Sequence, residues 1–207
     1  MVEITIAILV GAMGWSFTEY CVHRWLGHDR RFIKNFFGEE HTAHHSKGNY
    51  FSPAWKKALA ALAAVSILIG PAVFIAGPRL GISFVLGFVG FYLYYEWYHR
   101  SDHISAGWGA YGRYMRRHHF YHHFHDPNAN FGVTSPIWDL AFGTFAKVGV
   151  VRVPEKLQMR WLCDPKTGDV WNELKPYYEL RRLRIPPVSP QESCTSSSVI
   201  ETVKQAA

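Results

Sequence analysis

The stretch "ALAALAAVSILIGPAVFIAG", residues 58–77, decides the fold because its twenty residues carry no charge. At about 1.5 Å per residue, a helix of this length spans roughly 30 Å, the thickness of the hydrocarbon core of a bilayer. After a tight turn at "GPR" comes "LGISFVLGFVGFYLYY", residues 80–95, which ends in aromatic residues typical of a membrane interface. The two segments predict a membrane-spanning helical hairpin rather than two buried helices of a soluble protein.

A third apolar segment, "ITIAILVGAMGWSFT" at residues 4–18, has only fifteen residues before Glu19. It spans a bilayer if it tilts, if the bilayer thins, or if Glu19 and Tyr20 lie in a protein interior so that the helix continues to Val22. A secretory signal is not favoured, because no Lys or Arg precedes the segment and no small-residue cleavage site follows it. We therefore expect an all-α integral membrane protein with about three spans.

The distribution of charge predicts the orientation of these spans. The 207-residue chain has a formal net charge of +6, although only 18% of its residues are charged. Residues 23–57 hold seven Lys and Arg, the hairpin turn holds one, and residues 99–207 hold fourteen. A hairpin returns the chain to the side it left, so both basic segments lie on one face, which the positive-inside rule makes cytoplasmic. Topology and anionic headgroups thus explain the charge better than nucleic acid, for which no binding module is recognisable.

All twelve histidines lie in these two basic segments. They form four clusters: "HRWLGH" at 23–28, "HTAHH" at 41–45, "HRSDH" at 99–103 and "HHFYHHFH" at 118–125. The second and third clusters space their histidines three or four residues apart, so their imidazoles share a helix face. In the first cluster His23 and His28 are five residues apart and converge only if the helix ends or distorts near Gly27.

The five histidines of the fourth cluster cannot all lie on one helix face. His119, His122 and His123 repeat the spacing of the second cluster, whereas His118 with His122 makes another pair four residues apart. The repetition favours the triplet. His118 and His125 are then residues of the surface or residues that hydrogen-bond a ligand.

The clusters together predict a metal site. Imidazole suits Fe, Zn, Cu and Ni, and the three cysteines are scattered without CxxC spacing. Ten histidines exceed what one metal ion accepts and suit two ions that share a site. Carboxylates beside the clusters are candidates to accept the second ring N–H, or equally to form salt bridges or helix caps. These are Glu19, Glu39, Glu40, Glu96, Asp102 and Asp126.

From Glu19 to Phe145 the pattern resembles the fatty acid hydroxylase superfamily, which includes sterol desaturases and sphingolipid fatty-acyl hydroxylases. The most specific part is "HFYHH" followed, eight residues later, by "GVTSPIWDLAFGT". His118 and His125 match no ligand position of the family. The histidines that fall on its ligand positions are His23, His28, His41, His44, His45, His99, His103, His119, His122 and His123.

The resemblance implies a dinuclear metal centre, with iron expected and zinc as an alternative in purified protein. Such a centre activates O₂ and inserts one oxygen atom into a C–H bond of a membrane-borne acyl or other hydrocarbon chain. Lipid or sterol desaturation and carotenoid hydroxylation are alternatives within the superfamily. A non-catalytic metal-handling membrane protein is the alternative from another class, although a transporter would place its ligands inside its spans. Without a fused haem domain, we expect a separate electron donor, a ferredoxin or a cytochrome with its reductase.

The expected organisation is a membrane-embedded hydroxylase-like domain over residues 1–153, whose cap is formed by 23–57 and 99–153. Residues 154–185 follow as a C-terminal extension, and residues 186–207 read as a disordered tail because they are rich in Pro and Ser.

Larger members of the superfamily often show four spans. "ISAGWGAYGRYM" and "SPIWDLAFGTF" are therefore candidates for an interfacial segment, a lid or a packing element. Trp138 and Phe142 are four residues apart, as packing residues on one helix face would be. The setting we expect is a bacterial inner membrane or the endoplasmic reticulum, with the metal site on the cytoplasmic face.

Overall fold

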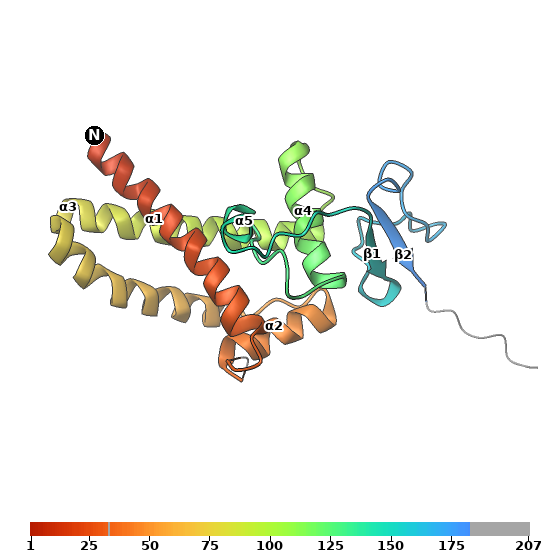
Figure 1. The fold of residues 1–207 in the computed structure, drawn as a ribbon, viewed down its shortest axis with the longest axis horizontal. Helices are drawn as coiled ribbons and strands as arrows, with labels where there is room; N and C mark the ends of the chain where they lie inside the picture. Colours follow the sequence, from red (N-terminus) through yellow and green to blue (C-terminus); the bar gives the residue numbers. More distant parts are fainter. Residues whose placement is uncertain (33, 183–207) are drawn as a thin grey trace, which may run out of the picture.

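The computed structural model describes residues 1–32 and 34–182, and most of these residues are helical. Long helices extend to one side of the molecule, and shorter helices and a small sheet gather at the other (Figure 1). The predicted disordered tail at 186–207 lies outside the described residues.

The predicted hairpin is present as α3, Ala54–Ile104, which consists of two helices joined at Gly77. Gly77 has φ 77° and ψ 164°, a backbone conformation that glycine adopts without the steric cost of a Cβ atom. We call residues 54–76 the first arm and residues 78–104 the second arm. Both arms extend beyond the apolar runs from which they were predicted.

The N-terminal helix α1, Val2–Cys21, continues without a break into a π-helical segment, η1, Val22–His28. Glu19 is 4% exposed and Tyr20 is 1% exposed, so the helix runs on past its apolar stretch inside the protein. Of the three conditions under which the segment could span a bilayer, the structure therefore meets the one in which Glu19 and Tyr20 lie in a protein interior.

Glycines bring α1 against the second arm of the hairpin. A Cβ atom on Gly11 would lie 2.0 Å from the carbonyl oxygen of Phe84, and one on Gly87 would lie 2.0 Å from that of Ile8. The two helix backbones therefore touch, and any larger residue at either position would push them apart.

Within residues 1–32 and 34–182, two helices are long and apolar enough to cross a membrane, namely α1 with η1, and α3. The most apolar window of α3 contains no buried residue, and Phe74 and Ile75 near the turn are 91% and 82% exposed. A helix in the core of a soluble protein would bury such side chains. The exposure therefore favours a lipid-facing hairpin.

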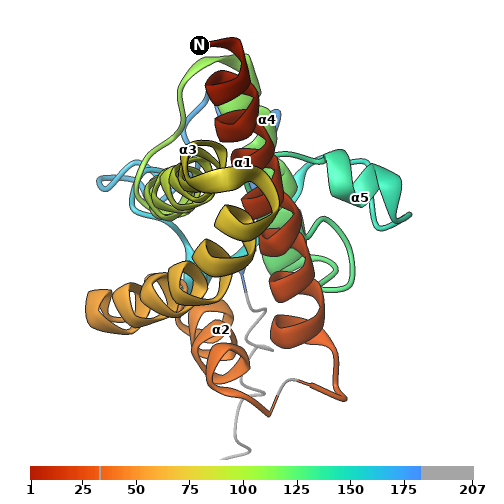
Figure 2. The same ribbon diagram turned by 90° about the vertical axis from the view of Figure 1, so that its left-hand side faces the viewer.

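Three shorter helices surround the end of the bundle: α2, Phe36–Lys47, α4, Gly109–Phe124, and α5, Ile137–Ala141. Asn35 caps α2, because its side chain accepts the backbone N–H groups of Phe37 and Gly38. Figure 2 shows α2 near the C-terminal end of α1, and α5 to one side of α1.

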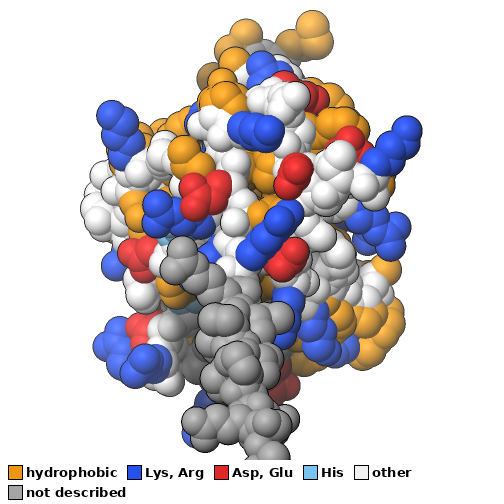
Figure 3. Space-filling view, turned by 90° about the vertical axis from the view of Figure 1, so that its right-hand side faces the viewer, with side chains coloured by type: hydrophobic (Ala, Val, Ile, Leu, Met, Phe, Trp, Pro, Cys, Tyr) orange, Lys and Arg blue, Asp and Glu red, His pale blue; other side chains and the backbone are white. Residues whose placement is uncertain are grey.

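The C-terminal segment adds a two-stranded parallel sheet of β1, Val151–Pro154, and β2, Tyr178–Arg181, with the short helix η2, Glu155–Leu157, after β1. The expectation of an all-α protein is therefore wrong in this segment, where strands of four residues are too short to show periodicity. β1 straddles the predicted domain boundary, and its Val151 and Val153 share a buried core with Phe120 of α4. At this end of the molecule, Lys and Arg side chains are interspersed with Asp and Glu among hydrophobic side chains (Figure 3).

Candidate metal centre

The structure brings the ten histidines that match ligand positions into two groups of five. Within each group, one possible ligand atom from every ring lies within 4.8 Å of all the others. The two groups adjoin, because the rings of His45 and His123 stack with centroids 4.0 Å apart. The first group is His23, His28, His41, His45 and His122, and the second is His44, His99, His103, His119 and His123.

The π-helical segment η1 supplies two ligand candidates of the first group. Its wider turn, with hydrogen bonds from i to i+5, places His23 and His28 on one face although they are five residues apart. The distortion expected near Gly27 is confirmed. A Cβ atom on Gly27 would lie 3.0 Å from the ring of His41, so this glycine lets α2 approach η1.

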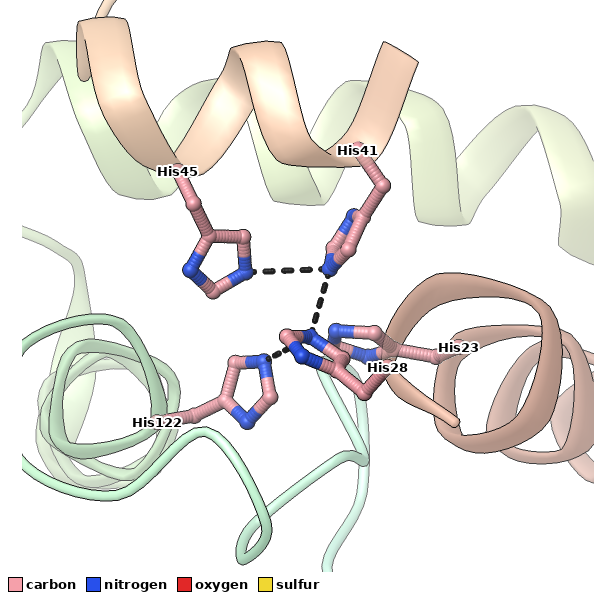
Figure 4. Close-up of side chains that lie close together, drawn as sticks. All are labelled: His23, His28, His41, His45 and His122. Atoms are coloured by element: carbon pink, nitrogen blue, oxygen red, sulfur yellow. Dashed lines mark hydrogen bonds between the residues drawn. The ribbon is translucent and has the colours of Figure 1, made fainter. Parts of the chain in front are cut away.

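Helices α2 and α4 each divide a histidine triplet between the two groups. In each triplet the two residues that are four apart share a helix face and join one group, while the remaining histidine joins the other. Thus α2 supplies His41 and His45 to the first group and His44 to the second, whereas α4 supplies His122 to the first and His119 and His123 to the second. Figure 4 shows rings from η1, α2 and α4 converging in the first group.

Backbone carbonyls fix the tautomers of three buried rings. Nδ1 donates in each: from His23 to Phe131 at 2.5 Å, from His44 to Tyr50 at 2.7 Å, and from His122 to Ala129 at 2.8 Å. A carbonyl oxygen only accepts, so the ring must carry its proton on Nδ1. In the neutral ring the lone pair is then left on Nε2.

The carboxylates that the sequence placed beside the clusters bind other partners. Glu40 accepts from Lys56 at 2.6 Å, Asp102 pairs with Arg116 at 3.1 Å, and Glu19 accepts the backbone N–H of Val133 at 2.7 Å. Glu96 contacts Lys57, Asp126 accepts from Asn128 in an exposed turn, and Glu39 is exposed. Of the two roles left open for these carboxylates, the salt bridge holds for Glu40, Glu96 and Asp102, whereas carbonyls of the loops beside the rings accept the ring N–H groups.

The ring nitrogens fit the donor set of a metal ion. Nε2 of His28 lies 2.8 Å from Nε2 of His41 and 2.9 Å from Nε2 of His122. Two nitrogens bound about 2.0–2.1 Å from one metal ion, at right angles, are about 2.9 Å apart. The buried Nε2 atoms of His23 and His123 have no hydrogen-bond partner. Unpaired buried lone pairs are costly unless a cation takes them, so each group can hold a metal ion.

Burial keeps these ligand candidates neutral at pH 7. It lowers the pKa of His44 to about 4. The pKa of His41 and that of His122 lie well below the usual value, mainly because of burial and to a smaller extent because neighbouring imidazoles repel a positive charge. Neutral imidazole is the form that binds metals. The site therefore needs no deprotonation of these rings before a metal binds.

His118 and His125 lie outside both groups, as the sequence predicted. His118 is nevertheless no surface residue, since it is fully buried and its Nε2 donates to the carboxylate of Asp139 at 3.0 Å. His125 is exposed, and its Nε2 accepts the backbone N–H of Arg152 at 2.8 Å, which links α4 to β1.

The segment "GVTSPIWDLAFGT" packs on α1, which confirms the packing role expected for it. The ring centroids of Trp138 and Phe17 are 4.8 Å apart, and those of Phe142 and Tyr20 are 5.4 Å apart. Sequence reasoning did not find that Glu19 anchors this segment. Buried carboxylates in a membrane helix are rare enough to have served as the signal.

A cavity of about 310 Å³ borders both histidine groups and is lined by α1, α2 and both hairpin arms. His41, His44 and His99 form its polar end, while Ala60 and Ala64 of the first arm form part of its apolar wall. Sequence reasoning missed these wall residues, although two alanines four apart in a membrane span leave room on one helix face.

Two ion pairs lie at the polar rim of this cavity. Lys56 pairs with Glu40 of α2 at 2.6 Å, and Lys57 pairs with Glu96 of the second arm. Tyr50 also donates to Glu40 at 2.8 Å. The cavity thus joins an apolar wall on the first arm to a charged rim, which these two ion pairs form at the start of that arm.

The chain resembles proteins of known activity. A family model for fatty acid hydroxylases matches residues 8–144. A dihydroceramide fatty acyl 2-hydroxylase from Arabidopsis thaliana is 27% identical over 170 residues, which cover 75% of this chain and 66% of the relative. A ceramide very long chain fatty acid hydroxylase from Schizosaccharomyces pombe is 29% identical over 151 residues, which cover 66% and 41% of the two chains.

The fatty acid 2-hydroxylase of Homo sapiens is 26% identical over 152 residues, which cover 66% of this chain and 38% of the relative. The chain therefore spans less than two thirds of the length of these curated relatives. A solved structure of full-length scs7p, in which only the hydroxylase domain is visible, matches with a TM-score of 0.59 at 22% identity. That match covers 70% of this chain and 57% of the other, and it shows a shared fold.

Proposed function

The chain belongs to the fatty acid hydroxylase family, and on that premise we propose that it is an O₂-dependent hydroxylase of a membrane lipid. The reaction would insert one oxygen atom of O₂ into a C–H bond, and two electrons and two protons would reduce the other oxygen atom to water. The observation that carries the proposal is the position of the two histidine groups, which border the cavity between the hairpin arms.

The metal centre in this proposal is dinuclear, with one ion in each histidine group and iron in the active enzyme. When bound, the two ions would supply the activation of O₂ that C–H hydroxylation requires. The ligand candidates are the ten histidines of the two groups. Their convergence, the short Nε2–Nε2 distances and the unpaired ring nitrogens support this assignment.

The surrounding residues orient the rings and exclude water. The carbonyls of Phe131, Tyr50 and Ala129 hold three rings with Nε2 directed into the groups. Second interactions of this kind fix ligand orientation and tune affinity in metal sites. His119 and His122 are completely buried, so reactive species at the site would be shielded from bulk water.

The substrate in this proposal is the fatty acyl chain of a ceramide-like lipid, as the names of the relatives suggest. An acyl chain entering between the arms would pass Ala60 and Ala64 and reach the rings of His44 and His99. The charged rim at Lys56 and Lys57 would then lie where a polar headgroup meets the interface.

The proposed topology has three spans, formed by α1 and the two arms. The cap of residues 23–57 and 99–153 would then lie on the cytoplasmic face, which the basic residues of these segments favour. Electrons would come from a separate ferredoxin or a cytochrome with its reductase. The hairpin and the C-terminal sheet lie at opposite ends of the molecule (Figure 1), and the surface at the sheet's end carries many charged side chains, as a water-facing surface would (Figure 3).

The test is to express the chain with labelled O₂ and to search the lipids for species that gain one labelled oxygen atom. We expect such lipids with the wild type and none with His44→Ala or His122→Ala. His125→Ala is the matched control, because this histidine lies outside both groups and we expect it to retain activity. Full activity in the His122 variant would overturn the ligand assignment, and the absence of any oxygenated lipid with the wild type would overturn the proposed reaction.

A further inference from the structure

A second cavity, of about 550 Å³, lies between α1 and the hairpin on the side away from the histidines. Its wall is almost entirely apolar and includes Ala7 and Val10 of α1, Leu68 and Ala76 of the first arm, and Phe84 of the second. No part of the proposed reaction uses this cavity.

One row of residues on the first arm lines both cavities. Ala60 and Ala64 border the cavity at the histidines, and Leu68, Ala72 and Ala76 border the second cavity. Each of these residues is four positions from the next, so each lies about one turn above the last with a drift of about 40°, and the five form one row that winds slowly around the first arm. The two cavities therefore follow one another along the hairpin.

Two aromatic side chains lie near the junction of the cavities: Trp15, which borders the first cavity, and Phe88, which borders neither. On the second arm, Phe84 borders the second cavity and Tyr92 borders the first, and Phe88 lies midway between them on the same face. Phe88 is 6% exposed, and its ring centroid is 5.3 Å from that of Trp15 on α1. Trp15 in turn packs on Tyr92 with centroids 4.6 Å apart. Movement of the Trp15 and Phe88 rings would join the two spaces.

We propose that the second cavity binds the far end of the substrate's acyl chain, and that Trp15 and Phe88 control which chain lengths reach it. The inference rests on the proposed function, since it takes the near part of the same chain to lie in the cavity at the histidines. The row of first-arm residues that runs from one cavity to the other and the apolar wall favour this occupant. A polar ligand would find no partner among the wall residues other than Glu3 at the N-terminal end.

The experiment changes the second cavity without touching the site. Ala76→Phe fills the cavity, and Phe88→Ala opens the passage to it. Two controls match these changes in kind: Ala63→Phe on the first arm and Leu86→Ala on the second, both exposed positions that line neither cavity. Purified full-length protein is offered an equimolar pair of ceramides that differ only in acyl length, and bound lipid is measured by native mass spectrometry.

We expect Ala76→Phe to lower the ratio of bound long-chain to short-chain ceramide roughly tenfold, because contact with about two methylene groups is lost. Phe88→Ala should raise the ratio, and the controls should leave it unchanged. An Ala76→Phe ratio equal to that of Ala63→Phe would overturn the inference, whether or not the Phe88 variant folds.

A second readout separates this inference from the proposed function. Acyl lengths of hydroxylated products are measured in cells that express the same variants. If bound lengths respond to Ala76→Phe but the wild type makes no hydroxylated lipid, the cavity assignment stands and the proposed reaction fails. If hydroxylated lipids form with the same lengths in every variant and bound lengths do not change, the reaction stands and the cavity assignment fails.

Discussion

Asp139→Ala should loosen the first histidine group although Asp139 contacts none of its members. The buried carboxylate accepts the backbone N–H groups of Phe131 and Gly132 at 2.8 and 2.9 Å, and His118 donates to it at 3.0 Å. The carbonyl of Phe131 in turn receives Nδ1–H of His23. Asp139 therefore positions the loop that orients one ligand candidate.

The size of the effect follows from the groups left without partners. Counting only the two buried backbone N–H groups, which cannot rotate toward another acceptor as the Thr144 hydroxyl can, alanine costs about 1–3 kcal/mol for each, so the free energy of unfolding falls by roughly 2–6 kcal/mol. For a chain of this length the melting temperature should fall by about 4 °C or more. Asp126→Ala is the control, because that carboxylate accepts from Asn128 in an exposed turn and should change stability by less than about 1 kcal/mol.

The assay is thermal unfolding of detergent-purified protein at one fixed scan rate, together with the metal content per chain. Asp139→Ala should melt earlier than Asp126→Ala and should hold less metal at equal free metal concentration. A melting temperature that falls no further than in Asp126→Ala would refute the anchoring role of the buried carboxylate. If Asp139→Ala kept the melting temperature of the control but held less metal, Asp139 would orient His23 without stabilising the loop.

Three further predictions concern the metal ions, pH and helix packing. Elemental analysis should find two metal ions per chain in the wild type and about one in His23→Ala, and a single ion in the wild type would contradict the dinuclear assignment. Burial lowers the pKa of His44 to about 4, so the unfolded chain takes up protons first as the pH falls below about 6.5, the ordinary histidine value. Denaturant titrations of metal-free protein should therefore show that the free energy of unfolding decreases as the pH is lowered from about 6.5 to 4. A free energy of unfolding that stays the same over this range would count against a neutral buried cluster. Gly87→Ala should lower the thermal stability, since its Cβ would meet the backbone of α1, whereas Gly90→Ala should not, because nothing lies within 4 Å of that position. Equal melting temperatures for the two glycine variants would contradict the close helix contact.

Local spacing made the histidines and the hairpin predictable. A charge-free run of membrane length is a strong helix signal, and residues three or four apart on a helix must share a face. The five-residue gap between His23 and His28 even predicted a distortion, which is present as η1. These inferences need no knowledge of which segments meet in space.

Contacts between distant segments set the limits of prediction. The division of each triplet between two groups depends on how α2 and α4 face each other, and the carbonyls that orient the rings belong to loops of no special sequence. The pairing of β1 with β2 joins short strands that are far apart in the chain. The walls of both cavities also follow from the crossing of α1 over the hairpin. Gly11 and Gly87 permit this crossing, but glycines alone do not allow it to be predicted.

The sharing of α2 between the histidine groups has a consequence for how the centre would fill. This helix is short and rigid, so an ion bound to His41 and His45 would also fix the direction of His44 toward the other group. The first ion would thus lower the entropy cost of binding the second, which is positive cooperativity without direct contact between the ions. Metal titration of the metal-free protein should then show few half-filled molecules, and the centre would behave as one unit that is either complete or empty.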